Sequence, residues 1–188
     1  MTREGYVLSL LCLAIAVAVS ISPVQSQNRS QEEESAGPSV AGGGEFRTVD
    51  ESAATPNSAE LALWQLVNAD RVRNGLPELA YDAELITVAR VRARDQVTQP
   101  QLSHSNGNGQ LAYMTLIQEM GLFFSVAGEN VVRVFGPATE IAQRAEDMLM
   151  GSPTHRAVIL EPRFESMAVG SVVDPSGSVV FTQIFRAS

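Results

Sequence analysis

Two apolar runs near the end of the chain, Ser166–Val173 and Ser178–Phe185, constrain its fold more than any other feature. The four residues between them are Asp174-Pro175-Ser176-Gly177, which place aspartate, proline and glycine where a type I turn requires them. Two such runs joined by so short a turn predict an antiparallel β-hairpin. The fold therefore contains an antiparallel sheet, which other segments must cover.

Helical patterns precede the hairpin. Asn57 is followed three residues later by Glu60, a spacing that satisfies free backbone N–H groups at a helix start, and Asn74-Gly75 ends this first helix. Asp82 is predicted to cap a second helix. The residues expected on its inward face are Ile86, Ala89, Ala93 and Val97, and those expected to point largely into solvent are Arg90, Arg92 and Arg94.

The middle of the chain combines two further helices with one strand. Leu111–Met120 and the stretch opened by Gly136-Pro137 are predicted to be helical. Gly128–Val134 alternates as a strand does, which places the Glu129 carboxylate on a sheet face. Because helices come first and antiparallel strands last, the fold class is α+β, with helices packed on a sheet.

Residues 1–26 have the features of a secretory signal peptide. Arg3 lies near the start, an apolar run of 15 residues extends from Val7 to Ile21, and small residues suited to cleavage follow at 24–26. The run is shorter than the roughly 20 residues that a bilayer span needs, so we expect cleavage and no membrane span afterwards. An uncleaved anchor is the alternative. The protein is expected to be secreted or periplasmic.

The remaining chain divides into a linker and a domain. Residues 27–57 are polar, acidic and glycine-rich, which predicts a disordered tether, and residues 58–188 form the predicted folded domain. Cys12 is the only cysteine and lies in the signal segment, so the mature domain has no disulfide and depends on packing for its stability. We expect a monomer.

The charge balance excludes some classes of partner. All 13 basic residues are arginine, 21 residues are acidic, and the net charge is −8. Neither the linker nor the domain carries a basic stripe, so nucleic acid and anionic membrane surfaces are poor candidates for binding.

Several short motifs occur together in the predicted domain. They are Leu66…Asn68…Arg71…Gly75-Leu76-Pro77…Leu79…Asp82…Leu85…Ala89, then Ser103-His104-Ser105, Gly128-Glu129-Asn130, Ser152-Pro153-Thr154-His155-Arg156-Ala157-Val158-Ile159-Leu160, Val169-Gly170 and Thr182-Gln183. In this order they resemble the bacterial branch of the CAP (SCP-like) domain family, which includes cysteine-rich secretory proteins, insect venom antigens and plant pathogenesis-related proteins. The resemblance extends from about Ala59 to Phe185.

The resemblance implies a CAP-type α-β-α sandwich, with a central antiparallel sheet between helices and a cleft lined by histidines and acids. Carried over by position, the cleft residues are His104, His155 and Glu129. The second acid of the family corresponds to Glu146, with Asp147 as the rival. Thr154 replaces a frequent glycine and Leu149 a frequent tryptophan, so the cleft wall is expected to differ in shape.

Three kinds of chemistry are open to such a cleft. His104, His155, Glu129 and Glu146 could hold a divalent metal such as zinc, an expectation that depends on the resemblance. They could instead only join loops through hydrogen bonds, or activate water for hydrolysis. Ser103 and Ser105 flank His104 outside any nucleophile-elbow context, which argues against serine catalysis. Asn68 and Arg71 are interpreted as structural polar groups.

Two functions follow from these options. The first is a secreted, non-enzymatic binding module for a lipid, a cell-wall component or a protein partner. The second is a metal-dependent hydrolase that acts on an extracytoplasmic peptide or polymer. The lack of a conventional nucleophile motif favours the first, while the fold alone decides nothing about function.

Overall fold

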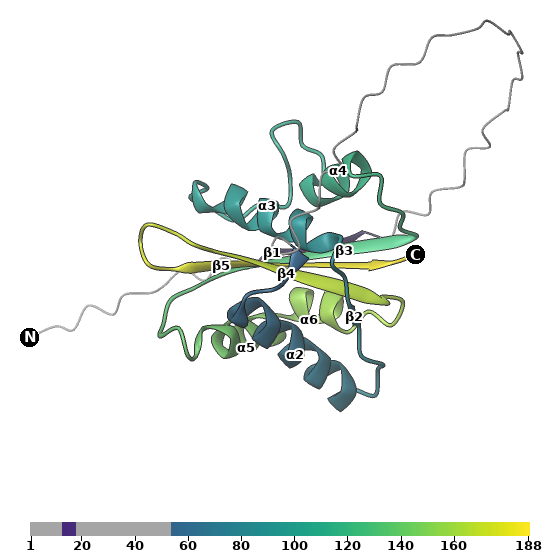
Figure 1. The fold of residues 1–188 in the computed structure, drawn as a ribbon, viewed down its shortest axis with the longest axis horizontal. Helices are drawn as coiled ribbons and strands as arrows, with labels where there is room; N and C mark the ends of the chain where they lie inside the picture. Colours follow the sequence, from purple (N-terminus) through teal and green to yellow (C-terminus); the bar gives the residue numbers. More distant parts are fainter. Residues whose placement is uncertain (1–12, 18–53) are drawn as a thin grey trace, which may run out of the picture.

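The computed structural model describes residues 13–17 and 54–188. These residues form three layers, with the sheet in the middle, α3 and α4 on one face, and α2, α5 and α6 on the other (Figure 1). The elements are β1 Leu13–Val17, α2 Ser58–Arg73, β2 Ala80–Tyr81, α3 Leu85–Val97, α4 Ala112–Glu119, β3 Val126–Val134, α5 Ile141–Gly151, α6 Pro153–Ile159, β4 Ser166–Val173 and β5 Val179–Ala187.

The sheet has the strand order β1-β3-β5-β4-β2. All neighbouring strands pair antiparallel except the two-residue β2, which pairs in parallel with β4. Each face of the sheet carries its own hydrophobic cluster, one against α2, α5 and α6 and the other against α3 and α4. The predicted α+β class and the α-β-α sandwich are thus confirmed.

Local capping and turn rules explain the ends of several elements. Asn57 and Glu60 form the predicted capping box of α2, and Gly75 follows the helix with a φ of 76°. The predicted hairpin is formed by β4 and β5. Its turn is closed by a hydrogen bond from the Gly177 N–H to the Asp174 carbonyl, and serine donors lower the pKa of the Asp174 carboxyl to about 2.

One expected helix differs from the structure. The fourth helix begins at Ile141 rather than at Gly136-Pro137, because residues 138–140 form a turn. His155 lies within a further short helix, α6, where Pro153 occupies the first turn. Proline fits a first helical turn because the N–H that it lacks would have no partner there.

The predicted signal segment overlaps one described element. Leu13–Val17 forms β1, which pairs antiparallel with β3 at the edge of the sheet. The other residues of the predicted signal, and most of the predicted linker, lie outside the described residues, so the predicted limits of the three segments stay predictions. Within the described residues, no helix has the length and hydropathy needed to cross a bilayer.

Helix α3 packs closely on the sheet at Gly170 in β4. A Cβ atom added at Gly170 would lie 2.2 Å from the backbone carbon of Ala89. Gly170 therefore sets the separation between α3 and the sheet, and with it the position of every side chain that α3 presents to the neighbouring strands.

We expect Gly170→Ala to lower the free energy of unfolding by about 1–3 kcal/mol, because backbone atoms must move to admit the methyl group. Gly151→Ala is the matched control: the added methyl meets nothing within 4 Å and lies in the last turn of α5, so it should leave stability unchanged or raise it by ~0.5–1 kcal/mol. Urea unfolding of both variants measures the difference. Equal effects would contradict the close packing at Gly170.

Candidate functional site

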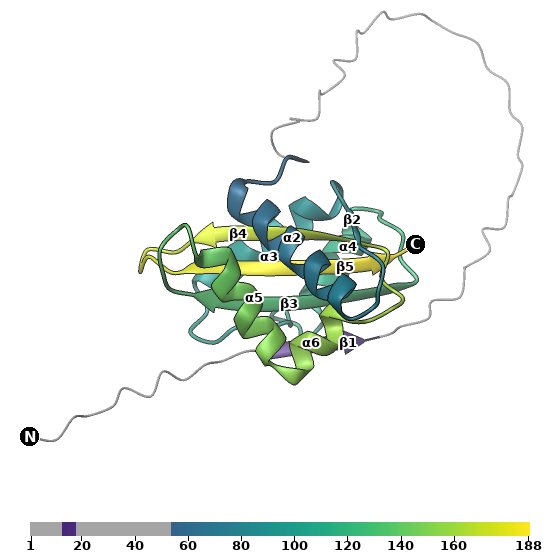
Figure 2. The same ribbon diagram turned by 90° about the horizontal axis from the view of Figure 1, so that it is seen from below.

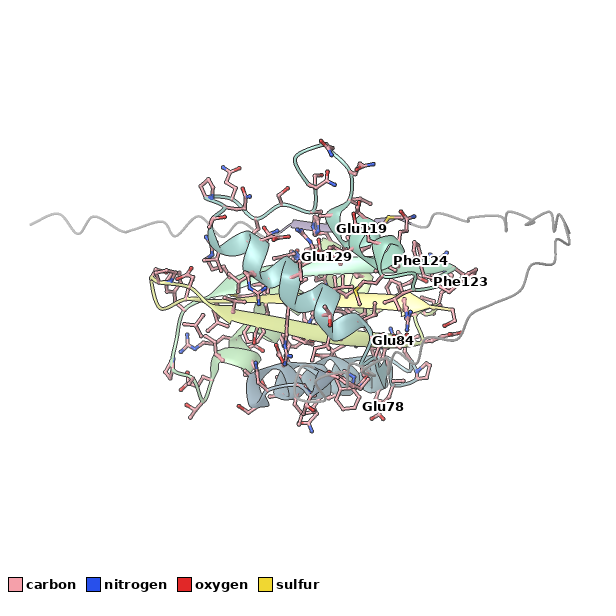
Figure 3. The ribbon with its side chains drawn as sticks, turned by 45° about the horizontal axis from the view of Figure 1, so that its top comes forward. Glu78, Glu84, Glu119, Phe123, Phe124 and Glu129 are labelled. Carbon is pink, nitrogen blue, oxygen red and sulfur yellow. The ribbon has the colours of Figure 1, made fainter. Side chains whose placement is uncertain are left out.

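The centre of the candidate site is the Glu129 carboxylate, which projects from β3 on the side of the sheet covered by α3 (Figure 3). Glu129 is fully buried, and Arg92 of α3 donates to it through Nε at 2.7 Å and Nη2 at 3.3 Å. The Nδ1 atom of His104 lies 2.6 Å from Oε2 of the same carboxylate. We call Arg92, His104 and Glu129 the Glu129 cluster.

Arg92 corrects the sequence interpretation, which placed it in solvent. Its side chain is only 2% exposed, because it lies on the same helical stripe as Ala89 and Ala93. A buried guanidinium needs hydrogen-bond acceptors, and Arg92 finds them in the Glu129 carboxylate and the Ser103 carbonyl. That stripe was the signal in the sequence that could have identified Arg92 as a site residue.

The loop that carries His104 is fixed by α3 and α4. The Gln96 side-chain amide donates to the Ser103 carbonyl and accepts from the Ser103 N–H, both at 2.8 Å. The Ala112 N–H donates to the His104 carbonyl at 2.8 Å. These bonds fix the main chain at Ser103 and at His104, and so they hold the His104 imidazole against Glu129.

Some buried polar atoms on this face have no hydrogen-bond partner among the described residues: Nε2 of His104, the Tyr113 hydroxyl, Oγ1 of Thr182 and Nε of Arg133. The Tyr113 ring belongs to the hydrophobic cluster against α3 and α4, and burial and the charge of Glu129 raise its pKa. Thr182 faces Val131 across the β3–β5 pair, diagonally from Glu129. Buried polar groups usually have partners, so these atoms are exceptions within the described residues.

A polar pocket of about 520 Å³ lies beside this cluster, between the end of α3 and the His104 loop. Arg92 belongs to both the Glu129 cluster and the pocket. Its guanidinium contacts Glu129, and Arg92 also lines the pocket next to Asp95. The pocket residues are Arg92, Asp95, Gln96, Thr98, Gln99, Ser103, Ser105, Asn106, Gly107 and Ala112. Almost all of them bear charged, amide or hydroxyl groups.

Among the described residues, no hydrogen bond joins His155 or Glu146 to this cluster, so the expected four-residue cleft stays a prediction. Glu129 and Asn130 are consecutive in β3 and point to opposite faces of the sheet. Asn130 points toward α5 and α6, where its Nδ2 donates to the His155 carbonyl at 3.2 Å and to Oε1 of Gln183 at 3.0 Å. Asn130 thus holds the backbone of α6 at His155.

Glu146 belongs to the network on this second face. Nε2 of Gln183 donates to Oε2 of Glu146 at 3.4 Å, and Glu146 is 1% exposed, whereas its rival Asp147 is exposed and accepts a hydrogen bond from Gln143. We call Asn130, Glu146, His155 and Gln183 the Asn130 network. Burial, and then the neighbouring Asp70, raise the pKa of Glu146 to about 8.

Zinc binding by the four predicted residues stays a prediction. The Glu129 carboxylate contacts His104, while Glu146 accepts from Gln183 in the network that also includes the His155 carbonyl. At neutral pH the raised pKa of Glu146 favours its protonated form, which is a poor metal ligand. In the described part of the chain, no three His, Cys, Asp or Glu side chains group as metal ligands.

Asn68 and Arg71 have the structural roles that the sequence predicted. The Asn68 amide exchanges hydrogen bonds with the backbone of Leu79. Arg71 donates to the carbonyls of Pro77, Ile159 and Glu161, which joins α2 to the end of α6.

The raised pKa of Glu146 predicts a pH dependence of stability. Below its ordinary pKa of 4.5 the carboxyl is protonated in both the folded and the unfolded states. As pH rises, the unfolded chain releases this proton first, so the free energy of unfolding falls between about pH 4.5 and 8. The variant Glu146→Gln cannot ionise at this position. As pH rises from 5 to 8, its free energy of unfolding should therefore increase by on the order of 3 kcal/mol relative to that of the unaltered protein.

Denaturant titrations at several pH values measure this difference. Glu119→Gln is the control, because Glu119 is exposed at the end of α4, in the helical layer on the other face of the sheet (Figure 1), and its substitution should leave the pH profile unchanged. A Glu146→Gln variant with the profile of the unaltered protein would show that burial does not hold a proton on Glu146.

Comparison with known proteins agrees with the resemblance in the sequence. The model of the cysteine-rich secretory protein family matches residues 64–185. The Bacillus subtilis protein YkwD is 26% identical over 154 residues, which is 82% of this chain and 57% of YkwD. The chain therefore spans less than two thirds of that relative.

Solved structures share the fold. An extracellular protein containing an SCP domain from Bacillus anthracis has a TM-score of 0.60 and 26% identity, covering 70% of this chain and 41% of that chain. A cysteine-rich secretory protein from Staphylococcus aureus has a TM-score of 0.56 and 17% identity, covering 69% of this chain and 39% of that chain. At the lower identity only the fold is comparable. Because the family match covers well over half of its residues, this protein belongs to the CAP, or cysteine-rich secretory protein, family.

Proposed function

We propose that this protein is an extracytoplasmic, non-enzymatic binding module that takes a hydrophilic cell-wall component, such as a glycan or glycopeptide, in its polar pocket. The observation that carries the proposal is the lining of that pocket, in which eight of the ten residues bear amide, hydroxyl or charged side chains. The location follows from the predicted signal peptide. It also agrees with the description of the relatives from Bacillus anthracis and Staphylococcus aureus as extracellular and secretory proteins.

The chemistry of the lining favours a ligand rich in hydroxyl and amide groups. Gln96, Gln99 and Asn106 offer amides, and Arg92 and Asp95 add one charge of each sign. A lipid chain in this pocket would remove these groups from water without giving them hydrogen bonds, which costs free energy for each group. A sugar or peptide backbone can pair with them, so a cell-wall component fits better than a lipid.

The size and position of the pocket support the same proposal. A volume of about 520 Å³ lies within the range of small-molecule sites. One wall is fixed, because Arg92 and Gln96 are buried and hold the His104 loop. A ligand would therefore meet a largely preformed surface, which lowers the entropy lost on binding.

The alternative is a metal-dependent hydrolase, and one observation favours it. Nε2 of His104 has no partner among the described residues and lies in a side chain already held by a carboxylate, the arrangement found for metal-binding histidines. A catalytic zinc site commonly uses three protein ligands. His104 could supply only one of them, and Glu129 is already bound by Arg92.

Calorimetric titration of the mature chain with soluble peptidoglycan fragments tests the proposal. Asp95→Ala and Gln99→Ala alter exposed pocket residues, and each should weaken binding about fivefold to tenfold through the loss of one hydrogen-bonding group. Glu78→Ala, an exposed substitution outside the pocket, is the control and should bind as the unaltered protein does.

Two results would contradict this function. If none of the pocket substitutions weakens binding, the ligand binds elsewhere on the protein. Zinc-dependent cleavage of the fragments that is lost in His104→Ala would establish the hydrolase instead.

A further inference from the structure

The outer edge of β3 is a second candidate binding surface, on a different part of the molecule from the polar pocket. β3 pairs with β5 on its inner side and with β1 on its outer side. β1 is Leu13–Val17, which lies within the predicted signal segment. Removal of residues 1–26 would therefore leave β3 as the outermost strand of the sheet.

β3 has few of the features that protect edge strands from pairing. It is nine residues long, contains no proline, and keeps a continuous register with β5 from Val126 to Val134. Natural edge strands are commonly short or interrupted by bulges, proline or outward lysine. Here the two charged residues, Glu129 and Arg133, are already engaged by α3 and its neighbouring loop.

Helix α6 extends the surface beyond β3. α6 contacts both β1 and β3, and Figure 2 shows it alongside β1 at the edge of the sheet. Phe164 and Val158 pack against the β3 backbone at Gly128, where an added Cβ would lie 2.8 Å from Cζ of Phe164. A strand added next to β3 would thus gain backbone hydrogen bonds from β3 and support from α6.

We propose that the outer edge of β3 in the mature protein binds an extended peptide segment of uncharged, apolar residues, antiparallel to β3. The chain itself supplies the evidence for this occupant. The sequence Leu-Ala-Ile-Ala-Val pairs there over five consecutive residues, from Leu13 opposite Val131 to Val17 opposite Ala127. This occupant differs from β3 in sequence and carries no charge, which favours an apolar peptide over a second copy of β3.

Strand addition of this kind has a known physical basis. Main-chain hydrogen bonds supply the affinity, and the alternation of side chains along the strand supplies the selectivity. The site does not need the polar pocket, because the pocket lies between α3 and the His104 loop, whereas α6 covers the opposite face. Substitutions in the pocket and at the β3 edge should therefore act independently.

The mature chain from Gln27 is suited to a direct test. The family match covers residues 64–185, all of which remain when the signal segment is removed. The probe is a fluorescent peptide with the sequence Leu-Ala-Ile-Ala-Val between solubilising lysines. The matched control replaces the central isoleucine with proline, which lacks the N–H that pairs with a neighbouring strand.

Fluorescence anisotropy should show saturable binding of the first peptide and at least about tenfold weaker binding of the proline peptide. Absence of binding, or equal binding of both peptides, would overturn the proposal. So would a concentration-dependent dimer that the peptide does not dissociate, because the occupant of the edge would then be a second copy of the chain.

Cysteine cross-linking tests the register. The mature chain contains no cysteine, so Ala127→Cys introduces a single thiol. A peptide with cysteine in place of the final valine should form a disulfide with Ala127→Cys in a glutathione buffer, because these positions lie opposite each other. Val173→Cys, at an exposed position on β4, is the control. Equal cross-linking to both variants would contradict the register.

Discussion

The buried ion pair of Glu129 and Arg92 is the interaction on which the candidate site depends. Both side chains are almost completely removed from water, and a buried carboxylate without a partner would cost several kcal/mol. The pair joins β3 to α3, and Arg92 also holds the Ser103 carbonyl of the neighbouring loop. One guanidinium therefore joins β3 to the helix and the loop that border the polar pocket.

The opposite face of β3 has its own polar connection. Asn130 joins the strand to the His155 carbonyl in α6 and to Gln183 in β5, and Gln183 in turn reaches Glu146 in α5. The consecutive residues Glu129 and Asn130 thus each fix one helical layer to the sheet. This explains in physical terms why the Gly-Glu-Asn, Thr-His-Arg and Thr-Gln motifs occur together in one chain: they meet around β3.

Much of the fold could be predicted because its signals are local. The capping box of Asn57 and Glu60 and the turn at Asp174–Gly177 involve residues only three positions apart, so the sequence displays them directly. The closeness of α3 to Gly170, and the pairing of Leu13–Val17 with β3, join segments far apart in the chain. No local pattern reports such contacts.

The site was only partly predictable for the same reason. His104 and Glu129 were correctly expected to lie close together, yet Arg92 was assigned to solvent because arginine usually is, although its helical position matched that of buried alanines. The expected meeting of His104 with His155 stays a prediction. Neighbouring strand residues face opposite ways, so Glu129 contacts His104 on one face of the sheet while Asn130 holds the His155 carbonyl on the other.

Double-mutant cycles on unfolding free energy test this two-sided arrangement most directly. His104→Ala and Glu129→Gln should show a coupling of about 1 kcal/mol or more, because their side chains are in contact. His104→Ala and His155→Ala should be additive within about 0.5 kcal/mol, because no hydrogen bond or ion pair among the described residues joins the two side chains. A coupling between the two histidines as large as that between His104 and Glu129 would show that they share one site and would contradict the account.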